Sequence, residues 1–521
     1  EEASQKGVDV FRIFDSLNWV ENMKMPIETA LKTGKIVEGT ICYTGDITDP
    51  NETKYTLDYY VKKAKELESL GVHIFTIKDM AGLVKPYAAK KLISALKEEL
   101  NIPVNLHTHD STGNGVSTLL MASEAGLDIA DCAIGSMSSM TSNPCMNSLV
   151  EALKGTERDT GLNPDELTEL SQYYARIRPI YKQFESGMDA PNTEIYKYEI
   201  PGGQYSNLLA QVKEMGAAED FEEIKGLYKD ANQLLGNIVK VTPSSKVVGD
   251  FAIFMFKNGL TKENILEVGK DLSYPDSVVE YFEGMIGQPE GGFPEELQKI
   301  VLKDKKPIDV RPGSLLPDED FDYIAKGLKE NFYTENMEDP DILSQKTLSY
   351  ALYPKVYEDY CRHFEAYNDV TGLESHVYFY GLRKGEETTL KLDEGKYLII
   401  KFIDMTEPDE DGYRLLDFEV NGSIREIKVL DKNLEVKTDR RVKADKSNPA
   451  HLGSTIPGTV GKVLVNEGDE VTVNMPLMTV EAMKMETTVV STVNGKVDKI
   501  YVKEGEQVNQ EDLLISFEID E

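Results

Sequence analysis

The sequence predicts an α/β protein that begins in a (β/α)8 TIM barrel and ends in an all-β domain. Two observations lead to this prediction. Short apolar runs alternate with amphipathic helical stretches up to about residue 135, and a β-rich motif is duplicated near the C-terminus. Between these two regions the sequence predicts a helical extension and a small β-rich domain.

The alternation in the first part of the chain is typical of parallel βα units. Amphipathic helical spacing is clearest at 56–70 and 85–100. A closed barrel needs eight units and five are visible, so three strands are expected upstream of Glu1. The five strands are expected at 8–14, 36–43, 73–77, 104–107 and 129–134.

Beyond the barrel the pattern is mostly helical and then changes to strands near Leu373. A polar stretch with little apolar content, at 438–451, is typical of a flexible linker. The expected strands of the small domain are 377–382, 388–392, 398–402 and 416–420. The expected domains are 1–160 (barrel), 161–370 (helical extension), 371–437 (β-rich domain), 438–451 (linker) and 452–521 (all-β domain).

The last domain contains an internal repeat. Residues 458–471 align with 495–508 at a constant offset of 37 residues. A duplicated β motif predicts two similar four-stranded halves related by a pseudo-twofold axis. Lys484, in the run Glu-Ala-Met-Lys-Met-Glu, follows the first copy, where the chain must turn back. It is therefore expected at the tip of a hairpin.

Composition narrows the possible partners. The chain has 57 basic and 91 acidic side chains and a net charge of -34, which repels polyanions and argues against nucleic acid. No run of 18 or more apolar residues is present, so no membrane span is expected. The four cysteines lack a Cys-x-x-Cys pair. Such cysteine usage fits a reducing compartment, and a cytoplasmic location is expected.

A second candidate site lies at the ends of two predicted barrel strands. His107 and His109 are two residues apart, so both imidazoles can face one metal ion. Lys78 ends the preceding strand, and the carboxyl ends of adjacent barrel strands lie side by side. An ammonium cannot sit beside a cation, so Lys78 must be modified or excluded there. The alternative for the histidines is one buried and one solvated side chain. The alternative for Lys78 is a salt bridge to Asp79 or to an acid on the strands expected upstream.

Two resemblances to known protein families make these expectations more specific. The run around Lys484 resembles the biotin carboxyl carrier domain of biotin-dependent enzymes, with a lipoyl domain as the alternative. Over essentially the whole chain, the sequence resembles the pyruvate carboxylase family. The segments that resemble it are 10–18, 77–82, 107–110, 200–205 and 240–246.

The resemblance implies roles for individual residues. Lys78 would be carbamylated and would bind Mn2+ or Zn2+ together with His107 and His109. The family's fourth metal ligand, an Asp, and its pyruvate-binding Arg would lie on the first barrel strands, which are expected upstream. Thr242 would be a catalytic proton shuttle, although the sequence alone also fits a helix N-cap there. Ser245 and Lys246 would line the biotin pocket.

The activity implied is that of a biotin-dependent ligase: CO2 passes from carboxybiotin on Lys484 to pyruvate and gives oxaloacetate, a step of anaplerosis and gluconeogenesis. No phosphate-binding loop is visible, so ATP-dependent carboxylation of biotin is expected in a biotin carboxylase domain upstream. Biotin protein ligase is an expected partner, and the protein is expected to be a homotetramer. The alternatives are an oxaloacetate decarboxylase α subunit, a transcarboxylase subunit or a carrier that only presents biotin.

Overall fold

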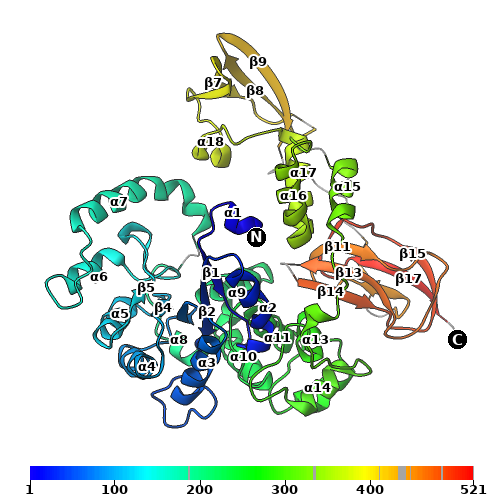
Figure 1. Cartoon of the computed structure of the whole chain (residues 1–521). Coiled ribbons are helices and arrows are strands. Elements are labelled where there is room, and N and C mark those ends of the chain that lie inside the picture. Colours follow the sequence, from blue (N-terminus) through cyan, green and yellow to red (C-terminus); the bar gives the residue numbers. More distant parts are fainter. Residues whose placement is uncertain are drawn as a thin grey trace. The chain divides into compact units, whose positions relative to one another are not determined.

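The chain divides by the density of its contacts into two compact units, Glu1–Leu316 with Lys443–Glu521, and Pro317–Val442. Within the described ranges, every helix is too short or too polar to cross a bilayer. The computed structural model (Figure 1) describes residues 1–185, 188–332, 336–409, 411–431, 442–445, 448–482 and 485–519.

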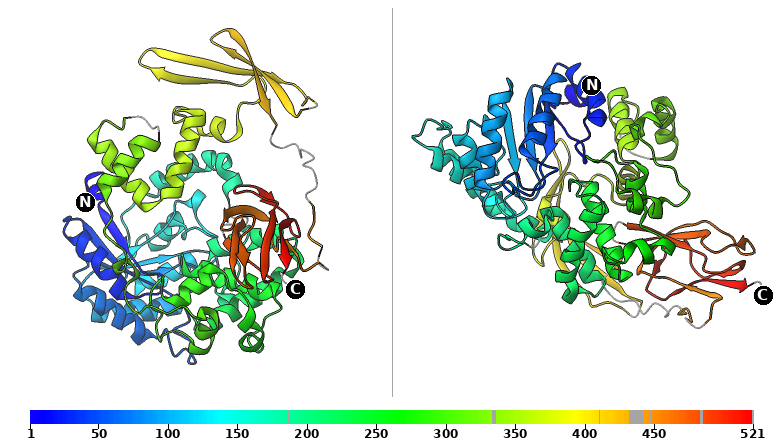
Figure 2. Two further views of the ribbon diagram at one scale, coloured as in Figure 1. Left: turned by 90° about the vertical axis from the view of Figure 1, so that its right-hand side faces the viewer. Right: turned by 90° about the horizontal axis from the view of Figure 1, so that it is seen from below.

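The first part of the chain forms a five-stranded sheet in which neighbouring strands run parallel and follow chain order. The predicted alternation is confirmed, although β3 continues to Asp79 and β5 ends at Ala130. The views in Figure 2 show the blue strands together with helices alongside them. The strands are β1 (Val10–Ile13), β2 (Ile36–Cys42), β3 (Ile74–Asp79), β4 (Val104–Thr108) and β5 (Ile129–Ala130). The helices are α1 (Glu2–Gln5), α2 (Val20–Leu31), α3 (Leu57–Ser69), α4 (Pro86–Glu99) and α5 (Gly115–Glu124).

The two faces of this sheet differ in polarity. Apolar side chains such as Ile41 and Phe75 are fully buried in the core that the helices share with the sheet. The alternate positions carry polar side chains, among them Glu38, Thr76 and Asn105. Because successive side chains of a strand point to opposite faces, one face of the sheet is packed by helices and the other carries hydrogen-bonding groups.

Helices dominate the rest of the first unit up to Leu316, as the sequence predicts. Their core is rich in aromatic side chains, and Tyr228, Phe251, Tyr281 and Phe282 are fully buried. The elements are η1 (Gly135–Met137), α6 (Met146–Leu153), α7 (Pro164–Ile177), η2 (Arg178–Phe184), α8 (Ile195–Tyr198), α9 (Gly202–Glu214), η3 (Ala218–Asp220), α10 (Phe221–Leu234), α11 (Ser244–Lys257), α12 (Ile265–Val268), η4 (Gly269–Asp271), α13 (Asp276–Glu283), α14 (Glu295–Leu302) and η5 (Pro312–Ser314).

The second unit combines helices with an antiparallel four-stranded sheet in the order β6-β7-β8-β9. A small apolar core forms around Leu328, Tyr357 and Cys361. The strands at 388–392, 398–402 and 416–420 are confirmed within longer strands, and β9 was not predicted. The elements are α15 (Phe321–Asn331), α16 (Pro340–Leu352), α17 (Pro354–Tyr367), α18 (Ser375–Tyr380), β6 (Glu387–Asp393), β7 (Lys396–Met405), β8 (Tyr413–Val420) and β9 (Ser423–Leu430).

The strand predicted at 377–382 is wrong, because Ser375–Tyr380 forms helix α18. Its run of Val, Tyr and Phe favours a strand by propensity. In the structure the Tyr378 ring lies edge-on to His363 of α17, with centroids 6.2 Å apart. Gly381 follows with a φ of +70°, a conformation that ends the helix. A helix that ends at a glycine and makes a ring contact with α17 therefore forms where local propensity favours a strand.

The C-terminal domain has two four-stranded sheets, β10-β17-β15-β12 and β14-β13-β11-β16. Strands β11, β12 and β13 recur 37 residues later as β15, β16 and β17. When each of these strands is replaced by its counterpart, the run β17-β15-β12 of the first sheet becomes the run β13-β11-β16 of the second. The two sheets are therefore arranged equivalently, which agrees with the predicted pseudo-twofold axis. The strands are β10 (His451–Gly453), β11 (Gly458–Val463), β12 (Glu470–Val471), β13 (Pro476–Ala482), β14 (Met485–Val490), β15 (Gly495–Ile500), β16 (Gln507–Val508) and β17 (Leu513–Ile519).

Candidate functional site

Lys78 and His107 are direct neighbours across the parallel pair of β3 and β4. Both stand at the carboxyl ends of their strands, on the polar face of the sheet. Cys42 of β2 is paired with Lys78 on its other side. Lys78 thus lies inside β3, where the sequence prediction ended the strand one residue before it. Its Nζ lies 5.3 Å from the ring centroid of Phe14, just beyond β1.

The two imidazoles face each other through their Nε2 atoms, which are 3.3 Å apart. Each Nδ1 has another partner: that of His107 lies 2.8 Å from a carboxylate oxygen of Asp131, and that of His109 lies 2.6 Å from the carbonyl oxygen of Thr141. We therefore assign the ring proton to Nδ1 in both cases. Two Nε2 lone pairs that converge in this way fit a shared cation.

Burial favours the uncharged forms of His109 and Lys78. It lowers the pKa of His109 to about 4, although the hydrogen bond to Thr141 acts in the opposite direction. Burial also lowers the pKa of Lys78, and the charge of Arg12 adds to this effect. His109 is therefore neutral at pH 7, which is the protonation state that a metal ligand requires.

A layer of polar side chains lies on the same face of the sheet, closer to the strand starts. Arg12 Nε lies 2.7 Å from Glu38, and its Nη1 lies 2.6 Å from Asp131. The Asn105 amide donates to Glu38 at 2.8 Å and to Asp131 at 3.2 Å, and the Thr76 hydroxyl also donates to Glu38. These hydrogen bonds connect all the strands of the sheet to the carboxylate that holds His107.

Burial would raise the pKa of Asp131, but hydrogen bonds from His107 and Arg12 outweigh it and hold that pKa well below its usual range. The carboxylate is therefore charged and orients the imidazole. Sequence reasoning did not identify Asp131, Glu38 or Asn105. The available signal was a charged residue, such as Arg12 or Glu38, inside an otherwise apolar strand run.

Across the described ranges, no cluster of three or more His, Cys, Asp or Glu side chains is arranged to hold a metal. The two histidines supply nitrogen ligands only. An ion bound between them would need further ligands, and Lys78 can supply one only as an anion.

Thr242 lies at a second place, in the exposed turn before helix α11. The helix begins at Ser244, and its N-cap is Pro243, without a side-chain cap. The N-cap alternative for Thr242 is therefore wrong. Among the described residues, the Thr242 hydroxyl makes no hydrogen bond. Ser245 is buried and Lys246 is exposed at the start of the same helix.

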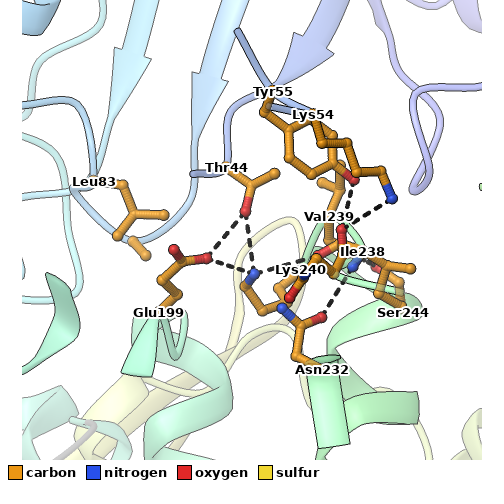
Figure 3. A network of polar contacts seen from close by, with 12 residues as sticks. Thr44, Lys54, Tyr55, Leu83, Glu199, Asn232, Ile238, Val239, Lys240 and Ser244 are labelled. Carbon is orange, nitrogen blue, oxygen red and sulfur yellow. Dashed lines mark hydrogen bonds and ion pairs between the residues drawn. The ribbon is translucent and has the colours of Figure 1, made fainter. Parts of the chain in front are cut away.

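Ser244 ties this turn to the barrel. Its hydroxyl donates to the carbonyl oxygen of Val239 at 2.7 Å and lies 3.3 Å from that of Ser16, just after β1. Lys240 contacts Thr44, which follows β2 (Figure 3). The structure thus brings Lys78, His107 and His109 together. No hydrogen bond among the described residues joins the Thr242 turn to this cluster.

Lys484 lies outside the described residues. The strands on either side of it, β13 and β14, are antiparallel neighbours, and Ala482 pairs with Met485. The position of Lys484 at the tip of a hairpin stays a prediction.

Comparison with known proteins covers nearly the whole chain. A family model described as HMGL-like matches residues 15–173, a conserved carboxylase domain matches 195–401, and a biotin-requiring enzyme domain matches 449–517. The carboxyl transferase domain of Rhizobium etli pyruvate carboxylase is 43% identical, with a TM-score of 0.77. The match covers 83% of this chain and 71% of that one. The chain belongs to the pyruvate carboxylase family.

Full-length members of the pyruvate carboxylase family support this assignment. The proteins from Bacillus subtilis and Staphylococcus aureus are 49% and 46% identical over 99% of this chain. The chain spans 45% of the length of each of these relatives. Family membership confirms the resemblance, the TIM-barrel type of the carboxyltransferase fold and the biotinyl domain that contains Lys484.

Proposed function

We propose that this chain performs the carboxyl transfer of a pyruvate carboxylase, in which a carboxyl group carried by biotin passes to pyruvate and gives oxaloacetate. The observation that supports this most directly is the convergence of His107 and His109 beside Lys78, at the carboxyl ends of parallel strands, in a chain that also contains a biotinyl domain. Active sites of TIM barrels form at this end of the strands.

In this proposal a divalent ion, Mn2+ or Zn2+, is held by His107, His109 and a carbamate on Lys78. The neutral Lys78 amine attacks the carbon of CO2, an N–C bond forms, and one proton leaves to solvent. The product is an anionic oxygen ligand, so the charge conflict between an ammonium and a cation disappears. The ion would stabilise negative charge that develops on the carbonyl oxygen of pyruvate.

Thr242 carries the proton in this proposal. Carboxybiotin first releases CO2 as the bond between N1 and the carboxyl carbon breaks and its electron pair stays on N1. The Thr242 hydroxyl then accepts a proton from the methyl group of pyruvate and donates its own proton to N1 of biotin, because a hydroxyl can do both at once. The resulting enolate carbon forms the new bond to CO2. The exposed position of Thr242 and the lack of a hydrogen bond to its hydroxyl among the described residues support this role.

The remaining assignments complete the proposal. Biotin is attached to Lys484, and Ser245 and Lys246 line the pocket that receives it. The segment 1–160 with 161–370 forms the carboxyltransferase domain, 371–437 mediates tetramer formation, and 438–451 links it to the carrier domain at 452–521. ATP-dependent carboxylation of biotin belongs to a domain outside this chain, and biotin protein ligase loads Lys484. Four unpaired cysteines support a reducing compartment such as the cytoplasm.

The activity is tested with the full-length protein that contains this chain. We expect oxaloacetate to form only when ATP, bicarbonate and pyruvate are all present, and mass spectrometry to find biotin on Lys484. Omission of each reactant in turn is the control. Decarboxylation of oxaloacetate that depends on Na+ or on a partner subunit, without ATP-dependent synthesis, would instead indicate a decarboxylase or transcarboxylase subunit.

Asp131→Asn tests the metal site without removing a ligand. The substitution keeps the shape but removes the charge that orients His107, and Arg12 keeps its bonds to Glu38. Loss of such an outer partner lowers metal affinity by about 10–100-fold, and we expect this loss when Mn2+ or Zn2+ binding is titrated.

Asp128→Asn is the matched control. Asp128 precedes β5, at the opposite end of that strand, where it pairs with Lys97 at 2.7 Å and accepts from the Val104 amide. Its replacement should leave metal affinity unchanged. Equal losses in the two variants would mean that Asp131 acts only on the fold.

A further inference from the structure

Thr242 stands at the exposed tip of a segment that is otherwise buried. Ile238, Val239 and Lys240 are no more than 2% exposed and Val241 is 7% exposed, whereas Thr242 is exposed. A lysine is almost never buried to this degree unless it is paired. We call the buried residues 238–241 the stem. The groups that hold the stem therefore determine where the Thr242 hydroxyl lies.

Lys240 fills its hydrogen-bonding capacity within the stem and its surroundings. Its Nζ donates to Glu199 at 2.7 Å, to the Thr44 hydroxyl at 3.1 Å and to the carbonyl oxygen of Ile238 at 3.3 Å. A lysine ammonium has three donors. The Thr44 hydroxyl in turn lies 3.2 Å from Glu199, which closes a triangle between three distant segments of the chain (Figure 3).

Glu199 adopts a backbone conformation that suits glycine better. It follows helix α8 with a φ of +54° and a ψ of +36°, in the left-handed region. A side chain with a Cβ is unfavourable there. The glutamate is nevertheless placed so that its carboxylate meets Lys240. Burial would raise the pKa of Glu199, but the charge of Lys240 outweighs it and leaves the pKa lowered.

The barrel loop between β2 and α3 makes two contacts with the residues directly before the stem. Lys54 Nζ lies 2.7 Å from the carbonyl oxygen of Gly236, and the Tyr55 hydroxyl donates to that of Asn237 at 2.8 Å. Both side chains come from the loop that also provides Thr44 (Figure 3). The stem is thus held by the barrel on one side and by Glu199 on the other.

We propose that Lys240 and Glu199 are positioning residues for Thr242. Their ion pair, together with Thr44, holds the buried stem against the ends of the barrel strands and keeps the Thr242 hydroxyl in place for proton transfer. This inference rests on the proposed function of Thr242. Lys240 itself touches neither pyruvate nor biotin and acts through the backbone that connects it to Thr242.

Lys240→Met in the full-length protein tests the inference, since Met fills similar volume without the charge. Misplacement of a reacting group costs up to about 100-fold in rate, so we expect kcat for oxaloacetate formation to fall about 10–100-fold with little change in KM for pyruvate. The solvent deuterium isotope effect on kcat should rise, because proton transfer becomes more strongly rate-limiting. Metal content should not change.

Lys225→Met is the matched control. Lys225 is equally buried, with 3% of its side chain exposed, and it pairs with Glu194 at 2.6 Å and Glu222 at 2.7 Å. It lies on α10, and its ion pairs within the described part of the chain are with Glu194 and Glu222 and not with the stem. This variant should lose thermal stability but keep kcat and the isotope effect. Equal effects on kcat in both lysine variants would overturn the inference.

A double substitution separates this inference from the proposed function. Because Lys240 acts through Thr242, Lys240→Met should add no further loss in a Thr242→Ala background, and an additive loss overturns the inference. If Thr242→Ala alone leaves the rate unchanged, the proposed role of Thr242 fails. If Thr242→Ala is inactive but Lys240→Met is fully active, only the positioning role fails. Should Lys240→Met not fold, Glu199→Gln removes the same charge pair and keeps the shape, with the same expectations.

Discussion

Thr242→Ala should abolish oxaloacetate formation while leaving ATP-dependent carboxylation of biotin nearly intact. A positioned proton-transfer group contributes about 10²–10⁴-fold to a rate, so we expect a loss of that size in the pyruvate reaction. The two activities are measured in the same full-length protein, one as oxaloacetate and the other as biotin-dependent release of phosphate from ATP.

The structure indicates that this substitution removes the proton-transfer group without disturbing the fold. Thr242 is exposed, does not cap α11, and its hydroxyl bonds to no described residue. Substitutions at such positions usually change stability by less than about 0.5 kcal/mol. Thr242→Ser is the control, since it keeps the hydroxyl and should retain most of the activity. Loss of both half-reactions in the alanine variant, or full activity in it, would refute the shuttle role.

The parts of the fold with a regular sequence pattern were the parts that could be predicted best. Alternation of apolar runs with helical periodicity indicates parallel βα units because each pattern follows from backbone geometry. The 37-residue repeat likewise indicates two equivalent sheets, because segments of similar sequence form corresponding strands. The segment 377–382 lacks such support: Ser375–Tyr380 forms a helix, in which the Tyr378 ring lies against His363.

The residues of the candidate site also fall into those that the sequence could predict and those that it could not. His107 lies near the end of β4 and His109 directly follows the strand, so their convergence follows from local geometry. Asp131 and Thr141 orient them from positions far along the chain, and no sequence spacing encodes such contacts. The pairing of Lys240 with Glu199 is equally non-local. Sequence reasoning therefore found side chains that local spacing or the ends of adjacent strands bring together, and missed partners that only the folded chain brings together.

Lys78→Ala should prevent metal binding, although no charge pair holds Lys78 in the described part of the chain. The argument rests on charge: two neutral imidazoles give nitrogen ligands only, and a carbamate on Lys78 would provide the neighbouring anionic oxygen. Its removal should lower affinity for Mn2+ or Zn2+ by at least about 10–100-fold, the loss expected even for an outer partner. Metal content is measured by elemental analysis after dialysis.

Two further measurements distinguish a carbamate from an ordinary lysine. Because the carbamate takes its carbon from CO2, affinity of the unsubstituted protein for the metal should fall in CO2-depleted buffer and recover with bicarbonate. A small carboxylate such as propionate should partly restore binding to Lys78→Ala, since it brings an anionic oxygen into the space left by the side chain. Lys85→Ala is the control, because Lys85 lies in the connection that follows β3 but pairs with Asp46 at 2.6 Å. Unchanged metal content in Lys78→Ala would show that Lys78 is not a ligand, and the two histidines would then need an oxygen ligand from elsewhere in the full-length protein.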